Sequence, residues 1–314
     1  MTHVNQTRLI LVGFTFGPSE QNILLLLFVI VYLISLIGNL SIIVAMCLDK
    51  RLHIPMYFFL ASLAFLDIWF ISSTVPKLLT ILASNNRFIS LTECILQFYF
   101  YVSLGTIEFY LLAVMSVDRY VAICNPLRYH SIISNRVCLC LVLGSWIFGF
   151  ITCIYPTILM LGLSFCGPYE INHFFCDSSA VVKISCSDVR HFETIVASLA
   201  SAIIFGSFIL TFISYCNILI TVLMIPSASG KIKAFSTCSS HFMVVSLVYG
   251  SAIFIYVRPV ERSSELNKIV ALLNSVMTPV LNPFIYSLRN KQVQQVFKSL
   301  ALKMFPSKNS VLKF

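Results

Sequence analysis

The chain has 314 residues, of which 58% are apolar and 11% are charged, and its mean hydropathy is +0.92. A soluble globular domain carries about 25% charged residues, and a disordered chain needs low hydrophobicity and high charge, so the composition excludes both classes. The net charge of +9 comes from 21 Lys and Arg against 12 Asp and Glu, and the basic residues are spread between apolar runs. This spread does not favour nucleic-acid binding, which needs a basic patch. The sequence predicts an integral membrane protein surrounded by the lipid bilayer.

Seven apolar runs are long enough to cross a bilayer as helices, which takes about 20 residues each. Transmembrane β-strands would instead appear as roughly ten-residue segments of alternating hydrophobicity. The expected fold is therefore an all-α membrane protein, a bundle of seven transmembrane helices with its termini on opposite faces. The runs are residues 21–48, 54–76, 94–117, 137–169, 194–230, 234–257 and 269–288.

Charges between the runs set the orientation, because cytoplasmic segments carry the excess of Lys and Arg. With the N-terminus outside, the inner segments hold thirteen Lys and Arg against two acids, Asp49 and Asp118. The sequence therefore predicts an extracellular N-terminal segment over residues 1–22, a seven-helix domain over residues 23–288 and a cytoplasmic tail over residues 289–314.

Both ends of the chain carry further signals. The first 20 residues lack the apolar core of a cleaved secretory signal, so the first span is expected to act as the signal anchor. Asn5 begins an N-glycosylation sequon, Asn-Gln-Thr, on the predicted outer face. In the tail, residues 290–305 predict a short amphipathic helix after the seventh span. Its apolar face is formed by Val293, Val296, Phe297 and Leu300.

Four of the 11 cysteines are predicted outside or at the outer rim of the bundle. Four cysteines allow three pairings, and their spacing does not choose among them. The other seven lie in spans or on the reducing side, where disulfides are rare. The segment His173 to Asp177 could also be interpreted as a metal site, but it offers too few ligands for a closed one. The four outer cysteines are Cys94, Cys166, Cys176 and Cys186.

Several short motifs follow one another at matching membrane depth. They are GN at residues 38–39, LHIPMY at 52–57, LAFLD at 63–67, MSVDRYVAICNPL at 115–127, SY at 214–215, KAFSTCSSH at 233–241 and PVLNPFIY at 279–286. Together they resemble the vertebrate odorant (olfactory) receptors, a family of rhodopsin-like, class A G-protein-coupled receptors. The resemblance covers about residues 14–298. Two departures, Ser116-Val117 where the family usually has Ala-Tyr and Val248 where it usually has an aromatic residue, affect helix packing.

The resemblance implies a function and a place in the cell. It implies a receptor that binds small volatile odorants in the outer half of the bundle and activates a stimulatory, olfactory-type heterotrimeric G protein, which raises cAMP. It implies a multi-pass protein of the plasma membrane, expected in the cilia of olfactory sensory neurons, and no enzymatic activity. It also implies that Cys94 is joined to Cys176, which leaves Cys166 with Cys186.

The resemblance further implies the residues that couple ligand to G protein. Arg119 would leave its neighbour Asp118 on activation and face the G protein, while Tyr215 and Tyr286 move inward. Taken alone, Arg119 could instead anchor the helix at the lipid headgroups. Pro283 cannot donate a helical hydrogen bond, so the seventh span can bend there. The coupling residues are Asp118, Arg119, Tyr120, Tyr215, Asn282, Pro283 and Tyr286.

Two acids lie within spans, where charge is costly and usually functional. Asp67 and Glu108 are both expected near the midplane, about 18 Å from Pro55 and about 16 Å from Arg119 respectively at 1.5 Å per residue. Asn39 can reach a similar layer. Two close carboxylates cannot easily both ionise, so they either share a proton or hold a cation between them. The resemblance favours a sodium ion; no other cofactor is expected.

A ligand cavity is expected in the outer half of the bundle. None of the candidate lining residues is charged, so the expected ligand is small, neutral and mostly apolar, with one or two hydrogen bonds. For each residue singly, plain packing explains its position as well as ligand contact does. The candidates are Tyr101, Val102, Gly105, Thr106, Leu199, Ala200, Ile203, Tyr249, Ala252, Ile253, Tyr256 and Ser275.

Three other classes of membrane protein fit less well. A transporter or channel would show inverted repeats or broken helices and a polar path, and the seven runs do not repeat. A retinal photoreceptor needs a Schiff-base lysine within the seventh span, and residues 269–288 contain none. A membrane enzyme needs a catalytic cluster within the bundle, and the spans show no such combination of residues.

Overall fold

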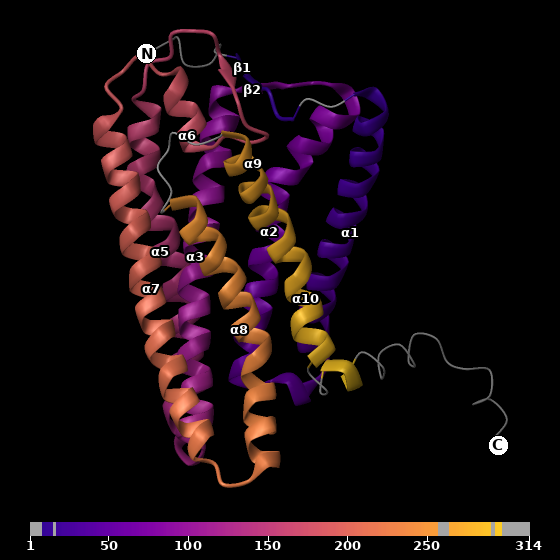
Figure 1. The fold of residues 1–314 in the computed structure, drawn as a ribbon, viewed down its shortest axis with the longest axis vertical. Helices are drawn as coiled ribbons and strands as arrows, with labels where there is room; N and C mark the ends of the chain where they lie inside the picture. The colour runs from indigo at the N-terminus through magenta and orange to yellow at the C-terminus, as the bar shows by residue number, and fades with distance from the viewer. Residues whose placement is uncertain (1–7, 15–16, 257–263, 290–292, 297–314) are drawn as a thin grey trace, which may run out of the picture.

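The computed structural model describes residues 8–14, 17–256, 264–289 and 293–296, and over these it is a bundle of long helices that run along one common axis (Figure 1). Six of the described helical segments are long and apolar enough to cross a membrane, and a shorter apolar stretch, Cys238–Ile253, lies within another helix. The main helices are α1 (Pro18–Leu48), α2 (Pro55–Ser84), α3 (Leu91–Cys124), α5 (Asn135–Leu161), α7 (Arg190–Met224), α8 (Ala228–Tyr256), α9 (Ser264–Leu272) and α10 (Thr278–Arg289), with a π-helical turn, η5 (Leu273–Met277), between α9 and α10.

Short helices occupy the connections. They are η2 (Lys50–Leu52), η3 (Pro126–Arg128), α4 (Tyr129–Ile132), α6 (Ser178–Val181) and η4 (Val182–Ile184).

Helix ends follow local sequence signals. Ser90 caps α3 by accepting a hydrogen bond from the Glu93 N–H at 3.2 Å, and the Glu93 carboxylate accepts one from the Ser90 N–H at 2.9 Å, which forms a capping box. Pro55 opens α2, where its missing N–H costs nothing. Asn85 ends α2 in the left-handed conformation with a φ of 52°, which asparagine tolerates better than most residues.

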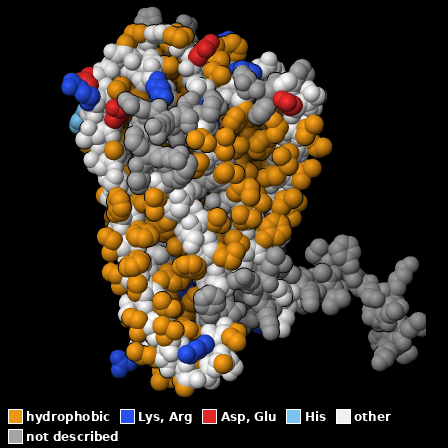
Figure 2. Space-filling model, viewed as in Figure 1, with side chains coloured by type: hydrophobic (Ala, Val, Ile, Leu, Met, Phe, Trp, Pro, Cys, Tyr) orange, Lys and Arg blue, Asp and Glu red, His pale blue; other side chains and the backbone are white. Residues whose placement is uncertain are grey.

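Burial separates the central helices from the peripheral ones. In their most apolar windows α2 and α3 are 56% buried, whereas α1 and α7 are 11% and 17% buried. Apolar side chains such as Phe148, Phe205 and Phe212 stand exposed on the flanks. Figure 2 shows hydrophobic side chains along the sides of the molecule and charged side chains at its two ends. This distribution fits a bundle whose flanks contact hydrocarbon.

A small β-sheet lies at one end of the bundle, hereafter the sheet end. β1 (Arg8–Leu11) pairs antiparallel with β2 (Phe88–Ser90) and parallel with β3 (Glu170–Ile171), with Leu9 opposite Ile89 and Leu11 opposite Ile171. Leu9 and Leu11 are fully buried. The all-α expectation omits this sheet, because strands of two to four residues are too short to show an alternating pattern.

Three spans also differ from the apolar runs. The fourth run predicts a helix to residue 169, but α5 ends at Leu161 because Gly162 follows and the next residues belong to the disulfide-bonded loop. The fifth run predicts a span as far as residue 230, but α7 ends at Met224. The next helix, α8, already begins at Ala228, within that run. The seventh run is not one regular helix, because η5 interrupts it. Apolar composition alone does not mark any of these boundaries.

Candidate functional site

A cavity of about 120 Å³ lies between α3, α5 and α7 near the sheet end. It is much smaller than the roughly 300–1,000 Å³ clefts that hold drug-sized ligands, so it suits a small molecule. Most of its wall is apolar or aromatic. The described lining residues are Phe70, Phe98, Tyr101, Val102, Gly105, Thr106, Phe109, Thr152, Cys153, Pro156, Cys176, Asp177, Ser178, Val196, Leu199, Ala200, Ile203, Ile204, Ala252 and Asn274.

Few polar groups face this cavity, and most of them already have partners. The Thr152 hydroxyl donates to the Phe148 carbonyl at 2.6 Å, and the Asn274 side-chain oxygen accepts from the Ser251 hydroxyl at 3.1 Å. The Thr106 hydroxyl lies 3.7 Å from the Cys153 Sγ, which is a weak partner. Thr106 is therefore a wall residue that can offer a hydrogen bond to a ligand.

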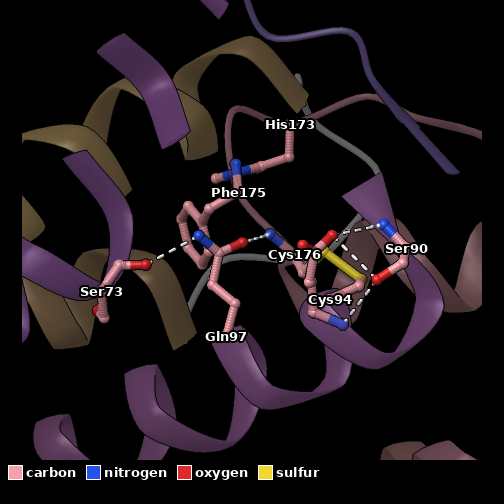
Figure 3. Close-up of a disulfide and its surroundings, with 8 residues drawn as sticks. Ser73, Ser90, Cys94, Gln97, His173, Phe175 and Cys176 are labelled. Carbon is pink, nitrogen blue, oxygen red and sulfur yellow. Dashed lines mark hydrogen bonds between the residues drawn. A yellow bond between two sulfur atoms is a disulfide. The ribbon is translucent and has the colours of Figure 1, made fainter. Parts of the chain in front are cut away.

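The loop that carries Cys176 borders the cavity at the sheet end. The Cys94–Cys176 disulfide ties this loop to α3, and the Gln97 side chain reinforces it by accepting a hydrogen bond from the Cys176 N–H at 3.0 Å (Figure 3). The other end of the Gln97 amide donates to the Ser73 carbonyl on α2 at 2.9 Å. Phe175, one residue before the disulfide, packs its ring 4.4 Å from that of Tyr101. Loop, α2 and α3 are thus joined directly above the cavity.

The second disulfide, Cys166–Cys186, also lies in the segment between α5 and α7. Both bonds have the pairing that the resemblance implies, which the spacing of the cysteines alone left open.

Two buried carboxyl groups lie deeper in the bundle. Asp67 and Glu108 are 1% and 2% exposed, and they are near enough for their charges to interact. The Asn282 amide donates to Asp67 Oδ2 at 2.8 Å, and the Asn39 amide donates to the Pro279 carbonyl, also at 2.8 Å. One oxygen each of Asp67, Glu108 and Asn39 is buried without a hydrogen-bond partner among the described residues. Such orphaned oxygens are what a cation or shared protons would satisfy.

The opposite end of the bundle, hereafter the Arg119 end, holds a buried ion pair. Arg119 donates to its neighbour Asp118, with Nε 3.0 Å from Oδ2, and the Tyr129 hydroxyl donates to the other Asp118 oxygen at 2.7 Å. Arg119 is 6% exposed. Both Asp118 oxygens are therefore occupied, and the guanidinium is held on its own helix.

Three tyrosines are also among the predicted coupling residues. The Tyr215 hydroxyl lies 2.7 Å from Nδ1 of His241, which links α7 to α8. The Tyr286 hydroxyl is buried without a hydrogen-bond partner among the described residues. Tyr120 packs with Ile218 and Val222 of α7. The sequence did not point to His241 as a partner of Tyr215.

Comparison with known proteins agrees with this architecture. Residues 28–304 match the family model described as olfactory receptor. Human olfactory receptor 6F1 is 47% identical over 91% of this chain and 93% of its own, and mouse olfactory receptor 6E1 is 49% identical over 93% and 94%. The chain belongs to the olfactory receptor family. It is therefore a multi-pass plasma-membrane protein and not an enzyme, and it senses odorants through a G protein.

The fold of this olfactory receptor is that of the class A G-protein-coupled receptors. Squid rhodopsin superposes with a TM-score of 0.73 at 17% identity, covering 96% of this chain and 85% of the rhodopsin chain.

A buried lysine, Lys268, lies one residue before the seventh apolar run. It is not among the described lining residues of the cavity. Its ammonium group donates to the Asn172 side chain at 2.6 Å and to the Gly13 carbonyl at 3.3 Å. Lys268 thus joins the N-terminal segment, the loop and α9 at the sheet end.

Eight of the twelve residues predicted to contact ligand line the cavity of the receptor. They are Tyr101, Val102, Gly105, Thr106, Leu199, Ala200, Ile203 and Ala252.

Three of the remaining four lie elsewhere. Tyr249 is buried behind the wall, with its ring 5.3 Å from that of Phe109 and its hydroxyl 3.4 Å from that of Thr211. Ile253 is 44% exposed on the flank, whereas its neighbour Ala252 takes the inward position. Ser275 is fully buried and donates to the Leu272 carbonyl at 3.3 Å.

The π-helical turn η5 explains the error at Ser275. A π-helical turn inserts an extra residue into the helical register, so the residues around it change face. In this receptor Asn274 lines the cavity where the sequence predicts Ser275. The side chain of the fourth residue, Tyr256, lies outside the described residues, as do Asn5 and residues 297–314 of the tail. Val293 and Val296, on the predicted apolar face of the tail helix, are buried.

Several lining residues were missed from the sequence. Thr152, Cys153 and Pro156 come from α5, from which no residue was predicted. The Asp177 carboxylate is the one charged group among the described lining residues, but its Oδ1 accepts the Ser179 N–H at 2.9 Å and caps α6. One feature of the sequence could have indicated that Asp177 lies near the cavity. It directly follows Cys176, whose disulfide with Cys94 brings the loop onto α3.

Proposed function

We propose that this olfactory receptor binds small, neutral, mostly apolar volatile ligands in the cavity between α3, α5 and α7, and that it activates a stimulatory heterotrimeric G protein and so raises cAMP. The observation that carries the proposal is the size and chemistry of the cavity. About 120 Å³ of mostly apolar space accepts a small molecule, and Thr106 offers it one hydroxyl. The wall holds one carboxylate, Asp177, whose Oδ1 caps α6 in the loop, and every other described lining residue is uncharged, which favours neutral ligands.

The proposal places the sheet end outside the cell. Both disulfides lie at that end, and disulfides form in oxidising compartments. Residues 1–22 are then extracellular and carry the glycosylation site at Asn5, residues 23–288 form the membrane domain, and residues 289–314 are cytoplasmic. Cilia of olfactory sensory neurons are the proposed location.

Signal transfer is proposed to start from the Asp118–Arg119 ion pair. In the resting receptor this pair keeps Arg119 against its own helix. A ligand shifts the equilibrium between two arrangements of the bundle only if it binds one of them better. In the active arrangement Arg119 leaves Asp118 and contacts the G protein, while Tyr215 and Tyr286 fill the space near α8, with α10 bending at Pro283.

Sodium is proposed as an allosteric ion between Asp67 and Glu108. The buried oxygens of Asp67, Glu108 and Asn39 that lack partners are hard ligands of the kind that such a cation prefers. Asn282 already holds the second oxygen of Asp67, which orients the carboxylate. A proton shared by the two acids is the competing occupant.

Odorant-evoked cAMP in cells that express the full chain with a stimulatory G-protein α-subunit tests the proposal. We expect neutral alcohols, aldehydes and esters among the agonists, and no response to charged amines. Surface-expressed receptor that responds to amines alone contradicts the ligand class. Agonist responses that appear only when an inhibitory α-subunit is supplied contradict the coupling.

A further inference from the structure

A second hollow lies on the flank of the bundle, between α5 and α7. It is a groove of about 660 Å³ whose floor is α3. α5 and α7 each pack along α3 but contact each other little, and Figure 1 shows the three as neighbouring helices. The groove follows α5 from Cys140 to Thr152, a length of about 18 Å at 1.5 Å per residue. It therefore opens sideways, onto the part of the molecule that faces hydrocarbon.

Two glycines, which have no side chain, leave the space that forms this groove. Gly144 on α5 and Gly206 on α7 both line it, and a Cβ added to either would meet no atom within 4 Å. Ser145 and Ser207 also line it, but their hydroxyls donate to carbonyls of their own helices, Leu141 at 2.8 Å and Ile203 at 2.7 Å. The groove thus presents an apolar surface to whatever enters it.

The groove and the ligand cavity share a wall. Thr152, Leu199 and Ile203 line both spaces. Of these three residues, Thr152 has its hydroxyl bonded to the Phe148 carbonyl, and Leu199 and Ile203 have aliphatic side chains. Aliphatic side chains change rotamer within nanoseconds where they have free space beside them. The loop that borders the cavity at the sheet end is instead held on α3 by the Cys94–Cys176 disulfide and by Gln97.

We propose that this groove is the entrance through which apolar ligands pass from the bilayer into the cavity, with Leu199 and Ile203 as the gate. The inference rests on the proposed function, because it assumes that the cavity binds small apolar ligands. Such molecules concentrate in hydrocarbon, so the groove offers them a short path from the phase they prefer. The continuity of its wall with the cavity favours the ligand as occupant over a lipid acyl chain, which would only cover the flank.

A time-resolved photolabelling experiment tests the entrance. The full-length receptor in bilayer nanodiscs is mixed rapidly with vesicles loaded with a photoactivatable octanol that carries a diazirine, flashed after increasing delays and mapped by mass spectrometry. In the wild-type receptor we expect adducts in the groove before adducts in the cavity. In Gly206→Trp, whose new side chain has room, the cavity should label about tenfold more slowly, a barrier increase of about 1.4 kcal/mol. Its final extent of labelling should be unchanged, because an obstructed route slows entry and exit equally.

Ile209→Trp is the matched control, because Ile209 is exposed on the same helix and is not among the lining residues of the groove. Gly144→Phe obstructs the opposite wall and should reproduce the delay if Gly206→Trp folds poorly. Cavity labelling at the wild-type rate in both groove variants overturns the entrance, as does a groove labelled by a photoactivatable phospholipid but never by the octanol. A wild-type cavity that takes no label at long delays overturns the proposed ligand site itself, which separates the two failures.

Discussion

The hydroxyl of Thr106 on α3 lies 3.7 Å from the Sγ of Cys153 on α5, and both side chains line the cavity. A thiol is a weak hydrogen-bond partner, so a ligand oxygen can take its place at little cost. The neighbouring hydroxyl of Thr152 differs, because the Phe148 carbonyl already accepts its proton. The two threonines therefore make different contributions to recognition, although both face the cavity.

Thr106→Val should lower the potency of oxygenated odorants. The exchange keeps the shape and removes the hydroxyl, and an unpaired polar group in a dry site costs about 1–3 kcal/mol. That corresponds to a roughly five- to 150-fold higher EC50 at about 1.4 kcal/mol per tenfold. Concentration–response curves for cAMP, with an alcohol agonist and a hydrocarbon-like analogue, measure the difference. Thr152→Val is the control and should leave both curves in place. Equal losses for both ligands in Thr106→Val would show that Thr106 only shapes the cavity.

Gly105→Val should exclude the larger odorants first. Gly105 lines the cavity, and a Cβ there meets nothing within 4 Å, so the added side chain occupies ligand space without disturbing the helices. Overpacking costs about 1–3 kcal/mol, so the longest agonists of a homologous series should lose roughly tenfold or more in potency. Gly250→Val makes the same exchange at an exposed position of α8 outside the wall and should change nothing. A uniform loss across the series would place Gly105 away from the ligand.

Gly149→Ala should destabilise the bundle. A Cβ at Gly149 would lie 2.3 Å from Cγ1 of Ile107, so α3 and α5 must move apart at a cost of about 1–3 kcal/mol. Gly144→Ala, on the same helix, meets no atom within 4 Å and should leave stability equal or slightly higher, because alanine favours helices over glycine. Thermal unfolding of the detergent-solubilised receptor measures both. Combining Gly149→Ala with Ile107→Ala should cost less than the sum of the two single losses, because Ile107→Ala removes the atom that the new Cβ meets; fully additive losses would contradict the contact.

The apolar runs were sufficient to predict the bundle, because each span must contain about 20 apolar residues whatever its neighbours are. They were not sufficient for the direction of single side chains. Ala252 faces the cavity and its neighbour Ile253 faces the flank, and apolar composition does not distinguish the two. Asn274 lines the cavity in place of Ser275, next to a π-helical turn that changes the helical register, and the apolar pattern does not mark that turn.

Contacts between distant segments were also beyond the sequence. β1 is held by β2 and β3, which lie about 80 and 160 residues further along the chain, and each strand is too short to show a period. The α5 side of the cavity, Thr152 to Pro156, was missed for a related reason. Its residues look like any lipid-facing turn until α3 and α7 are placed beside them.

Arg119→Ala should abolish odorant-evoked cAMP while the receptor still reaches the surface. The substitution removes the proposed G-protein contact and leaves Asp118 with the Tyr129 hydroxyl as a partner at 2.7 Å. Arg190→Ala is the control, because it removes an ion pair with Asp188 that is exposed at the sheet end. Exposed pairs contribute about 0–1 kcal/mol, so this control should signal normally. Surface labelling with cAMP measured in the same cells provides the test, and normal signalling by surface-expressed Arg119→Ala would refute the coupling mechanism.

Raising sodium at constant ionic strength should shift the agonist concentration–response curve to higher concentration. An ion held by Asp67 and Glu108 in the resting arrangement binds that arrangement better, and by linkage it must oppose any agonist that prefers the other one. Glu108→Gln removes one charge and keeps the shape of the side chain, so the shift should flatten. Ser116→Ala, a buried change elsewhere on α3 whose hydroxyl donates to Leu112 at 2.8 Å, is the control and should retain the shift. Membranes with purified G protein allow sodium to be exchanged for choline on both faces. The opposite result is a wild-type receptor whose agonist potency does not change with sodium but changes with pH. If Glu108→Gln also removes that pH dependence, the two acids share a proton instead.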